Sequence, residues 1–168
     1  AAPTKFSPWG LRVQGKPLIS LTPLFQSGAI EVQDEGSQLL ALLLGAKRGE
    51  MVADFCAGAG GKTLALGMQM RNTGRLYAFD VSARRLDKLK PRLVRSGLSN
   101  VVTIGIESEN DIRIKRLAGK LDRVLVDAPC SGLGPIRRNP DLKRRQGERD
   151  VIELALKQTK ILNAAARM

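Results

Sequence analysis

Short apolar runs recur along the middle of the chain, separated by polar or amphipathic stretches. Runs of this length that are bounded by glycine, asparagine or charged residues are typical of buried strands. Each run is followed by a segment whose apolar residues recur every three or four positions, which indicates a helix. The predicted strands cover residues 51–55, 75–79, 100–106 and 121–126.

Helix signals lie between these strands. A glycine-rich stretch after the first strand opens a predicted helix that runs to about Met70. Ser82 is placed to cap the next helix, and Gly97 ends it. A short basic helix over residues 112–120 precedes the fourth strand. The apolar face of the helix after Ser82 consists of Leu86, Leu89 and Leu93.

Three further signals concern the ends and continuity of helices. Pro91 lies inside a predicted helix and is expected to kink or divide it, because proline lacks the backbone donor. Asn139 followed by Pro140 is typical of a helix start. Asp150 with Glu153 resembles a capping box, and it opens a helix that continues to the end of the chain.

The alternation of strands and helices predicts an α/β fold with a doubly wound, mainly parallel sheet and right-handed crossovers. Such a sheet normally places another strand directly after a helix like the last one. We therefore expect residues 31–168 to form a core domain that is incomplete at its C-terminus.

The N-terminal part is less regular. Residues 1–30 contain four prolines between short apolar pieces, which indicates a lead-in with one or two short strands, or the tail of a preceding domain. Residues 29–33 are a further candidate strand. The polar residues 34–37 then open an apolar helix over 38–44, and Gly45 ends it.

The charge balance indicates a polyanionic partner or simply a solvated basic surface. The chain carries 28 Lys and Arg against 16 Asp and Glu, a net charge of +12. Nucleic acid is the most frequent partner of such a chain. With six aromatic side chains in total (4 Phe, 1 Trp, 1 Tyr), contacts to a nucleic-acid backbone are more plausible than base stacking on an aromatic platform.

Composition also excludes several classes of protein. Histidine is absent, which removes histidine acid–base chemistry and histidine-ligated metals, and two cysteines make a poor zinc site, so we expect no metal. No run is long and apolar enough to cross a bilayer, and the first residues lack a secretory signal. We therefore expect no membrane partner, and a cytoplasmic protein with free thiols.

A glycine-rich loop between the first predicted strand and its helix indicates a nucleotide-binding site. The sequence CAGAGGKT lets the backbone approach a ligand closely, and the following helix start favours negative charge. Its spacing is not that of a Walker loop. Asp80 ends the next strand, at the position where an acid accepts the two hydroxyls of a ribose. NAD and S-adenosylmethionine both use such a pocket.

The residues after the fourth strand favour S-adenosylmethionine. Asp127 and Cys130 lie on the tight turn that leaves this strand. Hydride transfer has no use for a thiol here, whereas methylation of carbon 5 of a pyrimidine does. A thiolate that adds to carbon 6 gives carbon 5 enamine character, so that it can attack a methyl sulfonium, and the carbon 5 proton must later leave. Asp127 is suitably placed to hold the edge of the base.

Five motifs make the assignment more specific. The chain contains VQDEGSQLLALLL, DFCAGAGGKT, AFDVSARRL, DRVLVDAPCSG and IRRNPD, in this order. These resemble the motifs of the Nol/Nop/Sun family of RNA cytosine-5 methyltransferases, above all the bacterial Sun-type branch that modifies ribosomal RNA. The resemblance covers the chain from about residue 25 onward. It implies a Rossmann-like core that uses S-adenosylmethionine, with strand order three, two, one, four.

The resemblance also implies roles for individual residues. Lys62 matches a lysine that points toward the catalytic centre, and Asp127 lies beside both the cofactor and the target cytosine. Asp111 matches the acid near the adenine, with Glu107 as the competing candidate. The residues implied near the RNA strand are Arg137, Arg138 and Asn139. The implied cofactor-binding residues are Cys56, Ala57, Gly58, Ala59, Gly60, Gly61, Lys62, Asp80, Asp111 and Asp127.

The sequence departs from the family pattern in two ways. The pattern usually reads CAAPGGKT, so Ala59 replaces a proline, which removes some loop stiffness but no functional group. The family also uses two cysteines, and the one that attacks carbon 6 lies in a Thr-Cys motif after the next strand. That motif does not occur in residues 1–168. Cys130 then matches the helper that assists product release, although in DNA cytosine-5 methyltransferases the Pro-Cys cysteine is itself the nucleophile.

The sequence therefore predicts transfer of a methyl group from S-adenosylmethionine to carbon 5 of cytosine in RNA, and the resemblance to the Sun-type branch implies ribosomal RNA. The full-length protein is expected to be the enzyme, while this chain binds the cofactor without turnover. One alternative is a catalytically silent RNA-binding module on a methyltransferase fold. Another is a dinucleotide-dependent oxidoreductase.

Overall fold

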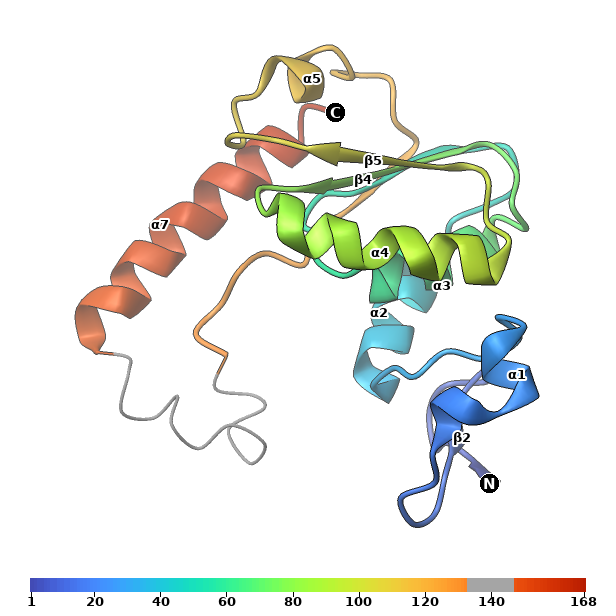
Figure 1. The fold of residues 1–168 in the computed structure, drawn as a ribbon. Coiled ribbons are helices and arrows are strands. Elements are labelled where there is room, and N and C mark those ends of the chain that lie inside the picture. The colour runs from blue at the N-terminus through green and yellow to red at the C-terminus, as the bar shows by residue number, and fades with distance from the viewer. Residues whose placement is uncertain (133–146) are drawn as a thin grey trace.

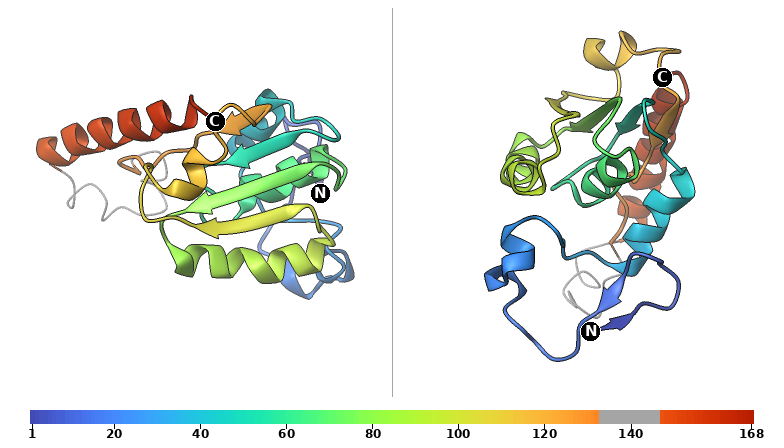
Figure 2. Two further views of the ribbon diagram at one scale, coloured as in Figure 1. Left: turned by 90° about the horizontal axis from the view of Figure 1, so that it is seen from above. Right: turned by 90° about the vertical axis from the view of Figure 1, so that its right-hand side faces the viewer.

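A four-stranded parallel sheet forms the centre of the computed structural model, which describes residues 1–132 and 147–168 (Figure 1). The strands lie in the order β5-β4-β3-β6, and all neighbouring pairs are parallel. This is the predicted order three, two, one, four, and the view onto the sheet in Figure 2 shows the strands side by side. The strands are β3 (Met51–Asp54), β4 (Arg75–Asp80), β5 (Val101–Gly105) and β6 (Arg123–Leu125).

Alternation along the strands divides their side chains between two helical layers. Val52 of β3 and Leu76 of β4 pack against the layer that lies below the sheet in Figure 1. Ala53 and Phe79 point to the opposite layer. Because both faces are covered, the strands are mostly apolar, and their charged residues lie at the strand ends. The lower layer consists of α2 (Glu35–Leu44), α3 (Gly61–Gln69) and α4 (Ala83–Ser96), and the other of α5 (Ile112–Lys115) and α7 (Glu148–Ala165).

The N-terminal segment is tied to the core by specific contacts. It contains β1 (Ala2–Pro3) paired antiparallel with β2 (Leu11–Arg12), then a 3-10 turn η1 (Ile19–Leu21) and α1 (Pro23–Gln26). The Glu35 carboxylate at the start of α2 accepts hydrogen bonds from the backbone N–H groups of Phe6 and Ser7. These bonds, of which that from Phe6 is the stronger influence, lower the pKa of Glu35.

The predicted strand over residues 29–33 is wrong. This stretch has no regular secondary structure. The Glu31 side chain forms ion pairs with Arg92 and Arg95 of α4. The stretch therefore lies against a helix and not beside a strand. Its backbone therefore lacks the neighbouring strand that a ladder of hydrogen bonds requires.

Three helices, α4, α5 and α7, differ from the prediction. α4 runs through Pro91 without a break, so the proline does not divide it. α5 ends at Lys115 instead of residue 120. α7 begins at Glu148, and Asp150 is its third residue, where its carboxylate accepts a bond of 2.7 Å from the N–H of Gly147. The predicted helix start at Asn139 lies outside the described residues.

Candidate functional site

The loop between β3 and α3 is held close to β4 and α4. The N–H of Ala57 donates to the carbonyl of Phe79, at 2.8 Å. Gly60 has φ +83°, and a Cβ there would lie 2.1 Å from the Leu89 side chain. Both its conformation and its packing therefore require glycine at this position. The loop ends at the start of α3, whose free N–H groups and dipole favour an anionic group.

Asp80 closes the loop from the end of β4. Its carboxylate is almost fully buried and accepts bonds from the N–H of Gly58 at 2.8 Å and of Ser82 at 2.7 Å. The Arg85 guanidinium forms an ion pair with it at 3.0 Å. A carboxylate offers about four acceptor positions. Asp80 therefore retains capacity for one further donor, or for two if Arg85 moves away.

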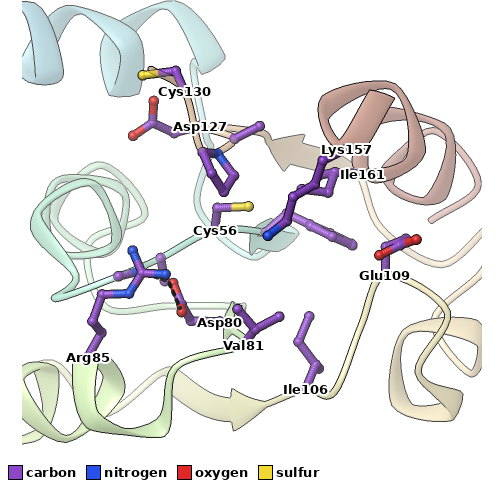
Figure 3. A pocket seen from close by; sticks show the side chains of 15 residues that line it. Cys56, Asp80, Val81, Arg85, Ile106, Glu109, Asp127, Cys130, Lys157 and Ile161 are labelled. Atoms are coloured by element: carbon purple, nitrogen blue, oxygen red, sulfur yellow. Dashed lines mark hydrogen bonds and ion pairs between the residues drawn. The ribbon is translucent and has the colours of Figure 1, made fainter. Parts of the chain in front are cut away.

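A cavity of about 300 Å³ opens at the carboxyl ends of β3, β4 and β6. In Figure 3, Asp127 and Cys130 lie at one end of it and Asp80 and Ile106 at the other, and Lys157 reaches in from α7. This is the edge where open α/β sheets bind ligands. The lining residues are Phe55, Cys56, Ala57, Gly58, Asp80, Val81, Arg85, Ile106, Glu109, Asp127, Ala128, Pro129, Cys130, Lys157 and Ile161.

The expected cofactor loop is divided between the cavity wall and its support. Cys56, Ala57 and Gly58 line the cavity. The next four residues lead into the first turn of α3 and do not line the cavity; they are Ala59, Gly60, Gly61 and Lys62.

Lys62 and Asp127 form an ion pair that links α3 to the turn after β6. The ammonium nitrogen lies 2.6 Å from one carboxylate oxygen, and the Lys62 side chain is only 16% exposed, against 46% for Asp127. The second carboxylate oxygen of Asp127 accepts from no donor among the described residues, which leaves it available at the cavity edge. The sequence pattern could not predict this pairing, because 65 positions separate the two residues along the chain.

A buried acid near this pair, Asp54, has no local signal in the sequence that indicates a role. Asp54 ends β3 and accepts a bond of 2.7 Å from the hydroxyl of Thr63. Burial raises the pKa of Asp54 to about 6, and the nearby carboxylates of Asp127 and Asp80 add to the rise. Its other oxygen has no partner among the described residues. Asp54 therefore ties the first turn of α3 to the central strand.

The two cysteines face the same cavity in different surroundings. Cys56 is half-buried, and burial raises the pKa of its thiol to about 11, so it is a poor nucleophile at neutral pH. Cys130 is exposed at the rim. The turn that carries it is anchored by Gln158 of α7, whose amide donates to the carbonyl of Pro129 at 2.8 Å. Both thiols are free.

The expected adenine-side acid lies outside the cavity wall. Asp111 caps α5 by accepting from the N–H of Arg113, and it also accepts from the N–H of Glu107. Its ion pair with the Arg113 side chain holds its pKa well below the ordinary range. Neither Asp111 nor Glu107 lines the cavity, whereas Glu109 does.

The expected RNA-side residues Arg137, Arg138 and Asn139 lie outside the described residues. Within residues 1–132 and 147–168, acidic and cysteine side chains form no cluster that could hold a metal ion. The described helices also include none with the length and hydropathy needed to cross a membrane.

The family model for 16S rRNA methyltransferase RsmB/F matches residues 41–168, from α2 through the loop, the cavity and α7. The chain belongs to this RsmB/F family. The matched region contains the loop after β3, Asp80, Asp127 and Cys130. The resemblance to the Nol/Nop/Sun methyltransferases is thereby confirmed.

Relatives of this RsmB/F chain modify ribosomal RNA according to their names. Ribosomal RNA small subunit methyltransferase B of Pasteurella multocida is 37% identical, over 94% of this chain and 36% of its own length. The 28S rRNA (cytosine(4447)-C(5))-methyltransferase of Homo sapiens is 34% identical, over 96% of this chain and 20% of its own length. The chain thus spans about a third or less of the relatives it matches.

Solved structures confirm the predicted Rossmann-like methyltransferase fold. NSun6 from Pyrococcus horikoshii, solved with SFG, superposes with a TM-score of 0.79 at 28% identity, over 90% of this chain and 38% of that one. A methyltransferase homolog protein from the same organism gives a TM-score of 0.74 at 36% identity, over 87% of this chain and 44% of that one.

Several cavity residues of the RsmB/F chain were not found from its sequence. Arg85 lies in the first turn of α4, five residues after Asp80. A basic residue so close to an acid could have indicated their ion pair. Lys157 and Ile161 are spaced four residues apart on α7, which indicates a shared helix face. No pattern in the neighbouring sequence indicates that this face of α7 lines the same cavity as the loop after β3, which lies about a hundred residues earlier.

Proposed function

We propose that this chain forms the S-adenosylmethionine pocket of an enzyme that methylates carbon 5 of cytosine in ribosomal RNA. The observation that carries the proposal is the cavity at the carboxyl ends of β3, β4 and β6. It brings together the loop after β3, Asp80, and the Asp127–Cys130 turn. Membership of the RsmB/F family supports the same reaction.

The residues that line the cavity suit the parts of S-adenosylmethionine. Asp80 has the acceptor capacity for ribose hydroxyls, and the backbone of Cys56, Ala57 and Gly58 offers close approach for the methionine part. The apolar side chains of Val81, Ile106 and Ile161 suit the faces of an adenine ring. The cofactor supplies an electrophilic methyl group when bound.

On the acceptor side, Asp127 is proposed to hold the edge of the cytosine with the carboxylate oxygen that Lys62 leaves free. Lys62 acts by fixing the direction of that carboxylate. Cys130 is proposed to assist product release, when loss of the carbon 5 proton lets the bond between carbon 6 and the attacking sulfur break. The attacking thiol belongs to the Thr-Cys motif of the family pattern.

The remaining roles combine the family pattern with the lining of the cavity. We propose that Asp111 stabilises the adenine-side loop by accepting from the N–H of Glu107, and that Glu109 is the acid that faces the ligand. Arg137, Arg138 and Asn139 are proposed to contact the RNA strand. Residues 31–168 are proposed as the methyltransferase core, and residues 1–30 as its lead-in.

Calorimetric titration of this chain with S-adenosylhomocysteine tests the pocket. We expect saturable one-to-one binding by the wild type, and a loss of about tenfold or more in Asp80→Ala, because a buried charged acceptor contributes strongly to a ligand hydrogen bond. Asp87→Ala is the matched control, since Asp87 is an exposed acid on α4. An inert wild type, or an Asp80→Ala variant that binds normally, would contradict the proposal.

A methylation assay with tritiated cofactor and ribosomal RNA addresses the acceptor side. We expect no turnover by this chain, because the family's attacking cysteine is not among its residues. Methylation by this chain would contradict that expectation. RNA binding without S-adenosylhomocysteine binding would instead favour the catalytically silent RNA-binding module, which the net charge of +12 also permits.

A further inference from the structure

Arg92 supports the loop after β3 from behind, on the side away from the cavity. It follows Leu89 by one turn of α4, and Leu89 packs beneath Gly60. The Arg92 guanidinium donates through Nη1 to the carbonyl of Ala59. Another guanidinium nitrogen lies 4.0 Å from the position that a Cβ on Gly61 would occupy. Arg92 therefore touches the centre of the loop without lining the cavity.

A carboxylate from the irregular stretch before α2 holds Arg92 in this position. Glu31 accepts from Nε of Arg92 at 3.2 Å and also pairs with Arg95 on the next turn. Arg95 in turn lies over the Phe25 ring, 3.7 Å from its centre. The side chains of Arg92 and Glu31 are only 21% and 25% exposed, so solvent screens their attraction weakly.

The loop needs such support because its own sequence leaves it free. Gly58 and Gly60 both have positive φ, at +56° and +83°. Glycine has the largest conformational freedom to lose on ordering. Ala59 stands where the family pattern has proline, so no ring restricts φ between the two glycines. A charge-assisted bond to the Ala59 carbonyl restricts the same residue from outside.

We propose that Arg92 is a positioning residue for the cofactor loop, and that Glu31 acts through Arg92. The pair fixes the Ala59 carbonyl and so preorganises the neighbouring backbone that faces the cavity. Binding then avoids the entropy of ordering the loop. Glu31 lies outside the residues that the family model matches, so the stretch before α2 contributes to the pocket by this contact. This inference rests on the proposed function of the loop.

A double-mutant cycle measured by calorimetry with S-adenosylhomocysteine tests the inference. We expect Arg92→Met to weaken binding about tenfold, because a hydrogen bond to a charged group is lost. Glu31→Gln should weaken binding by about threefold, since Arg92 keeps its bond but loses its partner charge. The double variant should bind no more weakly than Arg92→Met alone, because residues that act through one contact are not additive.

Two further variants separate positioning from general stability. Arg92→Lys keeps one charged donor and should recover part of the lost affinity. Lys90→Ala removes an exposed cation from the same helix and should bind like the wild type. Thermal unfolding of every variant is measured as well. Each titration is carried out at a temperature well below the unfolding midpoint of that variant.

The outcomes are distinguishable. Normal binding by Arg92→Met, or full additivity of the two losses in the double variant, would overturn the positioning role while leaving the pocket itself intact. Failure of the wild type to bind S-adenosylhomocysteine would overturn the proposed function, and the positioning role with it. Loss of affinity in Arg92→Met with partial recovery in Arg92→Lys and no additivity would support both.

Discussion

Three aspartates stand at the carboxyl ends of adjacent strands, and their partners give them different properties. Asp80 is buried but accepts from two backbone N–H groups and from Arg85. Asp127 is half-exposed and pairs with Lys62. Asp54 is dry and receives a single hydroxyl, so burial raises its pKa to about 6. Asp80 and Asp127 are therefore suited to bind ligands, and Asp54 to structural support.

The raised pKa of Asp54 predicts a stability effect. In the unfolded chain its pKa is near the ordinary 3.8, so the folded state binds an extra proton between about pH 4 and 6 and loses stability as pH rises through that window. Since each pKa unit corresponds to about 1.4 kcal/mol, the ionised carboxylate destabilises the fold by roughly 3 kcal/mol at neutral pH. Asparagine keeps an acceptor for Thr63 without the charge.

We therefore expect Asp54→Asn to be more stable than the wild type, with an advantage about 2 kcal/mol larger at pH 7.5 than at pH 4.5. Urea unfolding at both pH values measures the difference. Asp87→Asn, at an exposed position, is the control and should show little change. An advantage of Asp54→Asn that is equal at the two pH values would show that Asp54 is not desolvated.

At the scale of elements, α4 organises the site from below the sheet. One face of the helix carries Arg85 against Asp80, Leu89 beneath Gly60, and Arg92 against Ala59. These positions are three or four residues apart, which places them on a single stripe. A rotation or break of α4 would therefore disturb the loop and Asp80 together.

The uninterrupted course of α4 through Pro91 predicts a gain on removing the proline. Proline lacks the N–H that would bond to the carbonyl four residues earlier, and its ring crowds that carbonyl. We expect Pro91→Ala to stabilise the chain by about 1–2 kcal/mol after the greater freedom of the unfolded state is counted. Thermal unfolding measures this gain, and Val94→Ala on the exposed side of the helix is the control. A fall in the midpoint would show that α4 depends on the proline.

At the scale of the whole molecule, charge is the dominant feature. The net charge of +12 gives the chain a long-range attraction to polyanions. The cavity itself contains cations and carboxylates in similar measure. The excess of positive charge is therefore a property of the surface and not of the cavity.

This charge predicts RNA binding that depends steeply on salt. A protein that neutralises about five phosphates of single-stranded RNA loses roughly a hundredfold in affinity between 50 and 200 mM salt, because bound counterions are released. Fluorescence anisotropy with a labelled single-stranded RNA over this range measures the slope. An uncharged peptide nucleic acid of the same sequence is the control and should bind weakly at all salt concentrations. An affinity for RNA that does not change with salt would contradict a backbone-dominated interface.

Local patterns in the sequence were sufficient to predict the sheet and the position of the cofactor loop. The four strands, their parallel arrangement, the glycine loop and Asp80 at the end of β4 were all predictable. Each depends on signals within a few residues, such as apolar runs, helix caps and closely spaced glycines. The motifs also identified the family, because they combine several such local signals in a fixed order.

The pairing of side chains became visible only once the distant elements were packed together. Packing pairs Lys62 with Asp127 and Arg92 with Ala59 and Glu31, and it places Asp111 at the cap of α5. In the folded chain the stretch over residues 29–33 also lies against α4, and α7 lines the cavity with Lys157 and Ile161. These features depend on which distant elements meet. A polar side chain takes the nearest available partner in space, and the sequence pattern of either partner does not specify the other.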